Sequence, residues 1–497
     1  MHLSPLRLRL LVASLLIVSV LGALDHTIVS TSLATIAGSL GALEHMSWIV
    51  VAYTLASTVL QPVVGRLADH VGPRAVFLSA VAAFLLASLV CGLAPTMPAL
   101  IAARVVQGIS AGAVQLMSQT IIALVTTPRE RPKLTAIIGA AFPVAILVGP
   151  VLGGLIVDLL SWQWVFWVNL PFGLVALGIA AIAIPKLERM PSRGFDPLGS
   201  LTLTAGLVAL VLGVTWIGEQ ALLAQAVAAL ILGAVGLVAF GLIELRVPSP
   251  IVPLRLLADR TIAAGLALTA IIGIGLFSVT AYLPTYFQMA YRVSATASGL
   301  VPIATVFGML ASNLVTGWLV SRSGHYRAYC IVGTALGALG LGVMAALPHD
   351  LPLWAPMVVM AVVGIGTGAF MNLIIAVVQS AVPRAETSGI TATINLVRQI
   401  GATVATAVIG GALASGVAAR LPSTIDSSAL TPQHVQGAGE ATQALVAASY
   451  SGAMVPIFTA LAIVYGVGIV AALLLPARRL RDDTGPLTVA TPSPSNA

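Results

Sequence analysis

Asp25 lies within an uninterrupted apolar run, residues 10–36, that is long enough to cross a lipid bilayer. A carboxylate in the hydrocarbon region is costly, and in membrane spans such residues usually belong to proton relays, substrate sites or ion pathways. Burial favours the neutral acid and a neighbouring cation favours the carboxylate, so a group held between these influences can take up and release a proton. The position of Asp25 therefore predicts a role in moving protons.

Arg104, which lies in the apolar run 99–125, is the candidate cation for this carboxylate. At a rise of about 1.5 Å per residue, Asp25 lies roughly 16 Å and Arg104 roughly 9 Å below the outer ends of their runs. The two side chains can therefore meet if their helices are neighbours. A static ion pair that only joins two helices is the alternative. His26 points about 100° away from Asp25 around the helix, and we interpret it as polar lining or packing.

Arg398 lies centrally in the run 388–414, with no acid nearby in its own helix. It either contacts an acidic or polar group of a substrate, or donates to backbone carbonyls and to Gln399. Other carboxylates lie at the ends of runs, where solvation is expected: Asp158, Glu219, Glu244 and Asp350. Asp25 is then the only deep carboxylate, which predicts a low proton stoichiometry and no metal site.

Membrane helices are needed to position these residues. The chain is 59% hydrophobic and 8% charged, against about 25% charged residues in soluble domains. Runs of about 20 apolar residues predict transmembrane helices, and they occur near 10–36, 47–65, 75–95, 99–125, 134–157, 164–185, 198–217, 222–243, 261–287, 296–320, 328–347, 353–379, 388–414 and 451–475. We expect an all-α polytopic membrane protein with fourteen transmembrane helices.

The basic residues predict its orientation. With fourteen crossings and a cytoplasmic N-terminus, nineteen of the 23 Lys and Arg residues fall on the cytoplasmic side and two outside. Such a bias is typical of cytoplasmic loops, so both termini are expected in the cytoplasm. The net charge of +7 then reflects topology and attraction to anionic lipid, not nucleic-acid binding.

A loop pattern occurs twice, once in each part of the chain. Gly65–Arg74 and Gly317–Arg327 both follow G-x-L-x-[DS]-x-x-G with a basic residue shortly after. A loop repeated in this way predicts two parallel six-helix halves with a substrate cavity between them. The expected divisions are an N-terminal half at 1–197, an inserted helix pair with linker at 198–257, a C-terminal half at 258–475 and a disordered cytoplasmic tail at 476–497.

Several short elements resemble those of one family. They are Leu24-Asp25-His26-Thr27 in span 1, the loop Gly65–Arg74, Arg104-Val105-Val106-Gln107-Gly108 in span 4, Gly149-Pro150-Val151-Leu152-Gly153-Gly154 in span 5, Trp162–Phe166 with Asn169-Leu170-Pro171, and Arg398-Gln399-Ile400-Gly401 in span 13. Together, and in this order, they resemble the major facilitator superfamily and, within it, the fourteen-span drug:proton antiporters. Ser321 replaces the acid of the second loop, and Ala136 and Ala145 replace glycines of the span 5 element.

The resemblance implies a major facilitator fold and roles for several residues. Asp25 and Arg104 would form the proton-coupling pair. Gly65, Asp69, Gly72 and Arg74 would form a cytoplasmic gating loop, in which Asp69 caps a helix end and pairs with an arginine; a plain turn is the alternative. Gly149, Pro150, Gly153 and Gly154 would serve coupling and prevention of leaks, with small-residue helix packing as the alternative. The candidate cavity residues are Gln107, Arg398, Asn395 and Tyr282.

We therefore expect a proton-driven exporter of hydrophobic or amphipathic compounds in the cell membrane of a bacterium. Its partners would be small amphipathic substrates, protons and membrane lipids, and it would act as a monomer without a cofactor. The alternatives are an exporter dedicated to one natural product, lipid or siderophore, or a transporter-like sensor. A membrane enzyme is disfavoured because no span or loop carries a metal-binding cluster, nucleophile elbow or phosphate loop.

Overall fold

The computed structural model describes residues 4–41, 46–186, 196–216, 222–247, 254–348, 351–422, 435 and 439–480. Within these ranges the chain forms helices and no strand, apart from one isolated bridge between His325 and Arg479. The all-α fold predicted from composition is confirmed.

The helices fall into three successive groups. The first comprises α1 (Pro5–Ser39), α2 (Met46–Val59), α3 (Gln61–Val71), α4 (Pro73–Leu93), α5 (Met97–Val125), α6 (Arg131–Gly139), α7 (Ala141–Leu159), α8 (Trp164–Trp167) and α9 (Asn169–Ala183). The second is the pair α10 (Pro197–Trp216) and α11 (Leu223–Glu244). The third comprises η3 (Leu254–Ala258), α12 (Arg260–Ile272), η4 (Gly273–Phe277), α13 (Ser278–Ala290), α14 (Ala295–Ser298), α15 (Leu300–Ser323), α16 (Arg327–Ala346), α17 (Trp354–Ser380), η5 (Arg384–Glu386), α18 (Thr387–Ala418) and α20 (Glu440–Leu474).

Twelve helical stretches in the described part of the chain are long and apolar enough to cross a membrane. A thirteenth span is formed if α2 and α3, which meet at 47°, are taken together. The remaining predicted run, 261–287, is divided among α12, the π-helical turn η4 and α13, and its apolar helix Arg260–Gly275 is shorter than the other spans. Each predicted run therefore contains a helix, and fourteen crossings remain a prediction.

Local chemistry explains where several helices begin and end. Proline, whose missing N–H is tolerated in a first turn, occupies the first turns of α1, α4 and α5. Asp259 caps α12 by accepting hydrogen bonds from the backbone N–H groups of Thr261 and Ile262. Gly72 and Gly324 end α3 and α15 with φ angles of 102° and 73°, where a side chain would be strained.

Equivalent arginines make equivalent contacts in the first and third groups. Arg74 donates to the carbonyl of Ala181 near the end of α9 over 2.6 Å, and Arg327 donates to that of Leu473 near the end of α20 over 2.7 Å. A cation is favourable at the carbonyl end of a helix. Each arginine lies in the first turn of the helix that follows one of the two repeated loops, so the repeated sequence makes a repeated contact.

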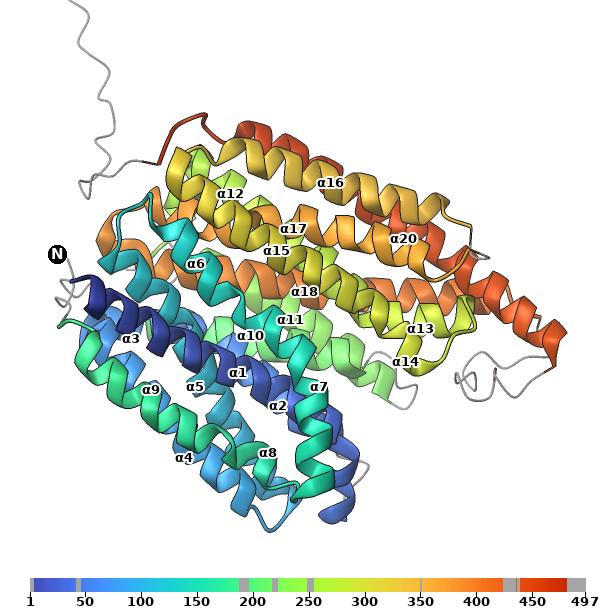
Figure 1. Cartoon of the computed structure of the whole chain (residues 1–497), viewed down its shortest axis with the longest axis horizontal. Coiled ribbons are helices and arrows are strands. Elements are labelled where there is room, and N and C mark those ends of the chain that lie inside the picture. The colour runs from blue at the N-terminus through green and yellow to red at the C-terminus, as the bar shows by residue number, and fades with distance from the viewer. Residues whose placement is uncertain are drawn as a thin grey trace, which may run out of the picture.

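The first and third groups form two halves that converge at one end of the bundle and diverge toward α7 and α14 (Figure 1). We call the convergent end, which carries Gly72 and Gly324, the motif end. Small residues bring the halves together there. A side-chain carbon added at Gly65 of α3 would lie 3.4 Å from Cβ of Ala392 in α18, and one added at Gly317 of α15 would lie 2.6 Å from Cβ of Ala136 in α6.

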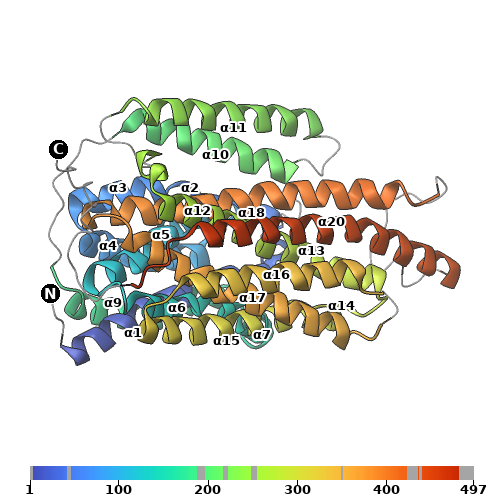
Figure 2. The same cartoon turned by 90° about the horizontal axis from the view of Figure 1, so that it is seen from above.

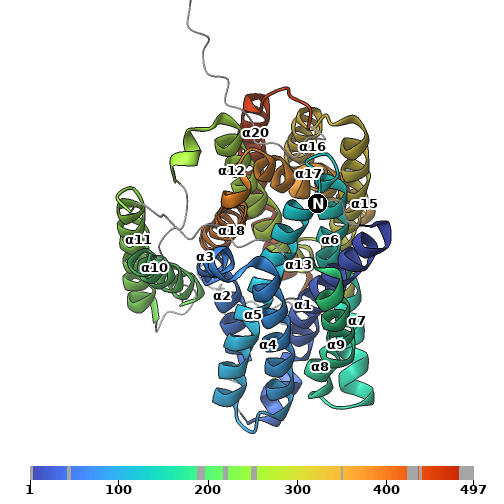
Figure 3. The same ribbon diagram turned by 90° about the vertical axis from the view of Figure 1, so that its left-hand side faces the viewer.

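The pair α10 and α11 lies outside both halves, beside α2 and α18 (Figures 2 and 3). An apolar cluster joins the pair to both of these helices; it contains Val59, Leu203, Leu207, Phe240 and Leu396. The inserted helices therefore cover the seam between the two halves on one side of the bundle.

At the base of this pair the structure corrects one expectation. Glu244, expected to be solvated, is 3% exposed, and Asp196 nearby is 6% exposed. The α10–α11 hairpin brings the last residue of α11 to the first turn of α10, where the Asp196 carboxylate accepts a hydrogen bond from the Gly199 N–H over 2.8 Å. The position of Glu244 at the end of an apolar run does not predict this burial, because the burial arises from contact between two helices.

Both described ends of the chain lie at the motif end. Arg7 donates to the carbonyl of Ala183 over 3.0 Å, and the N–H of Leu480 donates to the carbonyl of Gly324 over 2.9 Å. The predicted disordered tail begins at residue 476 and lies mostly outside the described residues, which end at 480.

Candidate functional site

Asp25 and Arg104 are in direct contact in the interior of the first half. The Arg104 Nη1 atom lies 2.5 Å from Oδ2 of Asp25, and both side chains are fully buried. The two residues come from α1 and α5, which pack as neighbours. Their similar depth, expected from counting residues along each run, is therefore matched by an ion pair.

Three further polar side chains complete this network. Gln107 and Asn169 donate to Oδ1 of Asp25 over 2.8 and 3.0 Å. The Gln107 oxygen accepts a hydrogen bond from Arg104 over 2.7 Å, and the Ser88 hydroxyl oxygen accepts one from Gln107 over 2.8 Å. The carboxylate thus receives donors from α5 and α9, while α4 supplies Ser88.

Arg104 is also enclosed on its other sides. Its Nε atom donates to the carbonyl of Ile49 over 3.1 Å, and its guanidinium carbon lies 4.1 Å from the centre of the Tyr53 ring and 5.8 Å from that of Phe166. Cation–π contacts of this kind stabilise a desolvated guanidinium. The network is therefore a sealed, charge-balanced unit, which we call the α1 network: Asp25, Ser88, Arg104, Gln107 and Asn169.

The sequence identifies Asp25, Arg104 and Gln107 as candidate site residues, but not Ser88 or Asn169. Asn169 stands in the element that follows Trp162–Phe166, so a signal was present in the sequence. Ser88 carries no such signal, because a single serine in an apolar span is not distinctive.

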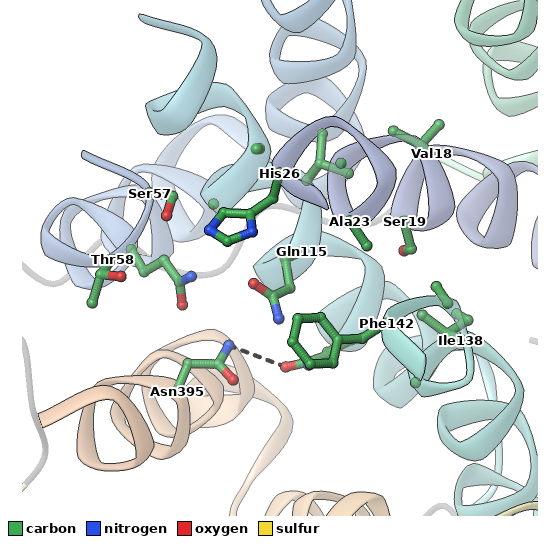
Figure 4. A pocket seen from close by; sticks show the side chains of 18 of the residues that line it. Val18, Ser19, Ala23, His26, Ser57, Thr58, Gln115, Ile138, Phe142 and Asn395 are labelled. Carbon is green, nitrogen blue, oxygen red and sulfur yellow. Dashed lines mark hydrogen bonds between the residues drawn. The ribbon is translucent and has the colours of Figure 1, made fainter. Parts of the chain in front are cut away.

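A cavity of about 320 Å³ lies between the two halves. On the first-half side, polar side chains from α1, α2, α3 and α5 line the cavity together with apolar ones. The polar side chains are Ser19, His26, Tyr53, Thr54, Ser57, Thr58, Gln61, Gln115 and Gln119. Figure 4 shows His26 and Gln115 pointing toward the middle of the cavity, across from Asn395 of α18. The volume and mixed lining are within the range of small-molecule sites.

The α1 network and the cavity lie on different faces of α1. Ser19, Ala23 and His26 line the cavity, whereas Asp25 does not. Tyr53 stands between the two regions, since it lines the cavity and stacks over Arg104. The carboxylate is therefore separated from the cavity in this conformation.

Arg398 and Asn395 both line the cavity from α18. The Arg398 Nη2 atom donates to Oδ1 of Asn395 over 2.9 Å, and Asn395 donates to Oε1 of Gln119 in the first half over 3.2 Å. Among the described residues, Arg398 forms no ion pair. Gly273, in the π-helical turn η4, packs directly on the backbone carbonyl of Arg398. Because Gly273 has no side chain, η4 can approach this turn of α18 closely.

The other two candidate cavity residues lie elsewhere. Gln107 belongs to the α1 network, and Tyr282 donates to the carbonyl of Thr406 in α18 over 2.9 Å. Neither is among the residues that line the cavity. His26 does line it, and its Nε2 atom lies 3.4 Å from the Thr54 hydroxyl.

The repeated loops lie where the halves meet. Asp69 forms an ion pair with Arg66 over 3.6 Å and hydrogen-bonds the Ser388 side chain in the first turn of α18. In the second loop, Arg129 of the first half donates to the backbone carbonyls of Ser321 over 3.1 Å and Arg322 over 2.5 Å. Both loops thus contact the opposite half, one through a carboxylate and the other through backbone.

Polar contacts between the halves continue toward the floor of the cavity. Asn313 of α15 donates to the carbonyl of Ala136 in α6 over 2.9 Å. Asn372 of α17, in the same half as Asn313, supports it by donating to its side-chain oxygen over 3.1 Å. Arg131 donates to the Ser380 hydroxyl over 3.3 Å. The cavity is therefore closed toward the motif end.

The glycines of α7 differ in what they contact. Side chains added at Gly149 and Gly153 would collide with Thr27 and Thr31 of α1, whereas no described atom lies within 4 Å of one added at Gly154. Thr27 also donates to the carbonyl of Ala145 over 3.1 Å. Gly149 and Gly153 therefore hold α7 against α1, one turn from Asp25.

Pro150 lies inside α7, where it removes one backbone hydrogen bond and favours a bend. In the part of the chain that the structure describes, no cluster of three or more His, Cys, Asp or Glu side chains is arranged to hold a metal ion.

Comparisons with known proteins agree with this architecture. The model of the family described as Major Facilitator Superfamily matches residues 15–406. The chain is 32% identical over 496 residues to an uncharacterised MFS-type transporter of Mycobacterium tuberculosis, covering 98% of this chain and 72% of the relative. It is 32% identical over 406 residues to the multidrug transporter protein MdtP of Bacillus subtilis, covering 81% and 75%.

Solved structures show the same fold. The human organic anion transporter MFSD10 superposes with a TM-score of 0.62 over 94% of this chain and 100% of its own, at 15% identity. At that identity the likeness concerns the fold alone.

Proposed function

The chain belongs to the Major Facilitator Superfamily, and from that premise we propose that it is a proton-coupled antiporter that exports hydrophobic or amphipathic compounds by alternating access. The family consists of membrane transporters and not of enzymes. The multidrug transporter MdtP, 32% identical to this chain, favours export of foreign compounds. The coupling residue and the direction of transport are inferred from the site.

One observation carries the proposal: α1 has Asp25 in the sealed network on one face and His26, Ala23 and Ser19 in the cavity on another. Protonation of Asp25 cancels its charge and leaves Arg104 without its counter-ion. The hold of α5 and α9 on α1 then weakens, and any movement of α1 changes the cavity wall. Proton and substrate can therefore influence each other through one helix without touching the same residue.

We assign the motif end to the cytoplasm because nineteen Lys and Arg residues fall on that side. The contacts between the halves then close the cytoplasmic side, and the structure corresponds to an outward-facing arrangement. Both termini are cytoplasmic in this assignment, and the protein acts as a monomer in the cell membrane of a bacterium. The proton gradient supplies the energy, and no cofactor is needed.

In this scheme the loop Gly65–Arg74 stabilises the outward-facing arrangement. Gly65 allows α3 to approach α18, and Asp69 holds Ser388 in the first turn of α18, where a carboxylate is favourable. Gly72 ends α3, and Arg74 fixes the following helix to α9. Opening toward the cytoplasm requires these contacts to break.

The close packing of α7 on α1 gives the span 5 element its role. Gly149 and Gly153 bring α7 against the turn of α1 that follows Asp25. A tight helix pair at this point limits water and proton leakage past the carboxylate, and the bend at Pro150 lets the two helices move together.

Transport into inverted membrane vesicles tests the proposal. Asp25→Asn should abolish uptake driven by a pH gradient, while the purified variant should still bind substrate, because Asp25 does not line the cavity. Its affinity for substrate should no longer depend on pH, because the group that couples protonation to α1 is gone. Asp158→Asn, which alters an exposed carboxylate at the end of α7, is the matched control and should transport like the unaltered protein. Uptake by Asp25→Asn at the unaltered rate would contradict the proposal.

The breadth of substrates needs a separate measurement. A strain that lacks the transporter should become hypersensitive to several unrelated dyes and antibiotics. Sensitivity to a single compound would instead identify a dedicated exporter of one natural product, lipid or siderophore.

A further inference from the structure

Arg398 gives the central cavity a positive charge that no carboxylate of the described residues balances. Resting on the proposed export function, we propose that the preferred substrates are monoanionic amphipaths, whose carboxylate pairs with Arg398 while the apolar part fills the rest of the cavity. Neither the fold nor the proton coupling specifies the charge of the substrate.

The absence of a counter-ion follows from both the lining and the sequence. No Asp or Glu occurs among the residues that line the cavity. In the second half, the sequence contains no acid between Asp259 and Asp350 or between Glu386 and Asp426. In the first half, Asp25 is already paired with Arg104 and does not line the cavity, and Asp69 is paired with Arg66 at the motif end.

Arg398 is available to an incoming anion. A guanidinium has five N–H donors in a planar fork that suits a carboxylate. In the described part of the chain, Arg398 makes one side-chain hydrogen bond, to Asn395, and has no acidic partner. A charged group in a poorly solvated site is costly unless it is paired, so a substrate carboxylate would supply the partner that the protein lacks.

The surroundings fit an amphipathic anion. His26 and Gln115 point into the cavity from the first half and provide further polar contacts (Figure 4). Phe142 and Met371 provide apolar surface for the body of the substrate. None of these side chains carries a negative charge, so a cationic compound would meet Arg398 without any compensating attraction.

The site also bridges the two halves. Arg398 bonds Asn395, and Asn395 in turn bonds Gln119 of the first half. A substrate carboxylate that accepts hydrogen bonds from both terminal nitrogens of Arg398 competes with Asn395 for the guanidinium. Substrate binding would thereby reach a contact that joins α18 to α5.

The charge of the substrate has an energetic consequence. If one proton enters through Asp25 for each substrate exported, a neutral substrate moves one charge across the membrane. A monoanion leaving as a proton enters moves two charges in the same electrical direction. Export of the anion is then driven more strongly by an inside-negative membrane potential.

Binding to the purified full-length protein tests the inference independently of coupling. Three matched fluorescent probes are compared: a dansyl-labelled alkyl carboxylate, its methyl ester and the corresponding trimethylammonium compound. The carboxylate should bind at least about tenfold more tightly than the ester, since a hydrogen bond to a charged group contributes about that factor or more. Equal affinity for the carboxylate and the ester, or preference for the cation, would overturn the inference.

Two variants locate the effect. Arg398→Gln should remove the preference for the carboxylate and leave ester binding nearly unchanged, whereas Arg398→Lys should keep part of the preference. Equal loss of both probes in Arg398→Gln would indicate damage to the cavity or fold and would count against anion recognition by Arg398. The comparison of the three probes on the unaltered protein remains decisive if a variant does not fold.

Proteoliposomes separate this inference from the proposed function. Under an imposed potential, the driving force on carboxylate export should respond twice as steeply as that on the ester. Equal responses would overturn anion export with one proton. An export rate that is independent of the pH gradient and unchanged in Asp25→Asn would instead contradict proton coupling. A binding preference for the carboxylate would still support anion recognition in that case.

Discussion

Each half of the bundle holds one arginine well inside a membrane span, Arg104 in α5 and Arg398 in α18, and their surroundings are opposite. Arg104 is fully buried, paired with Asp25 and bonded to Gln107. Arg398 lines the cavity, and in the described structure its side chain makes a single hydrogen bond, to Asn395, and has no acid beside it. The same side chain is thus part of a closed charge-balanced network in one half and an open donor in the other.

This difference indicates a division of labour between the halves. A charge that is already neutralised by the protein responds to protonation of its partner, and so suits coupling. A charge that is left without a partner responds to a ligand, and so suits recognition. The helix α1 connects the two regions, because Asp25 on one face belongs to the α1 network and His26 on another face lines the cavity.

The largest expected effect is on stability and separates the two arginines directly. Arg104→Gln leaves the Asp25 carboxylate buried without its cation, which should cost about 3–5 kcal/mol. Arg398→Gln removes one hydrogen bond but also an unpaired charge, so these two effects oppose each other and stability should change by about 1 kcal/mol or less. Thermal unfolding of the purified variants in detergent measures both, and similar losses would remove the distinction between a balanced and an unbalanced arginine.

A double variant sharpens the interpretation of the first result. Asp25→Asn combined with Arg104→Gln removes both buried charges, so most of the stability lost in Arg104→Gln should return. Proton-driven transport should not return, because no group remains to bind the proton. Stability and vesicle uptake are measured on the same preparations, and recovery of coupled transport would show that the proton binds elsewhere.

The packing behind α1 gives a smaller effect with a built-in control. Gly149→Ala forces a methyl group against Thr27 and should cost about 1–3 kcal/mol, together with increased proton leak. Gly154→Ala meets no described atom within 4 Å, and should be neutral or stabilising by about 1 kcal/mol or less. Leak rates in proteoliposomes carrying a pH gradient distinguish the two, and equal leaks would assign the glycines to general packing.

The smallest expected effect concerns the two loops at the motif end. Asp69→Asn weakens the contact of α3 with Ser388 in α18, so the outward-facing population should fall by a few-fold, corresponding to about 1 kcal/mol or less. Ser321→Ala is the control, because the Ser321 hydroxyl bonds only within its own helix and the contact with Arg129 uses its backbone carbonyl. Distances between spin labels on α3 and α18 report the population; an equal shift in both variants would argue against a special role for Asp69.

Several features of the site were accessible from sequence. The depth of Asp25 and Arg104 along their runs predicted that the two could meet, and they form an ion pair. Asn169 matches a family element, but the sequence does not predict its bond to Asp25. Ser88 had no distinguishing signal, and the burial of Glu244 depends on contact between α10 and α11.

The sequence by itself determined the helices, their approximate limits and the depth of each polar residue, because a span must be apolar over the thickness of a bilayer and a helix rises by a constant distance per residue. Only the tertiary structure decided which face of each helix meets which neighbour. Rotation about the helix axis is set by packing between segments far apart in the chain, and no local pattern records it. This rotation directs Asp25 away from the cavity, into the α1 network, and directs Arg398 into the cavity.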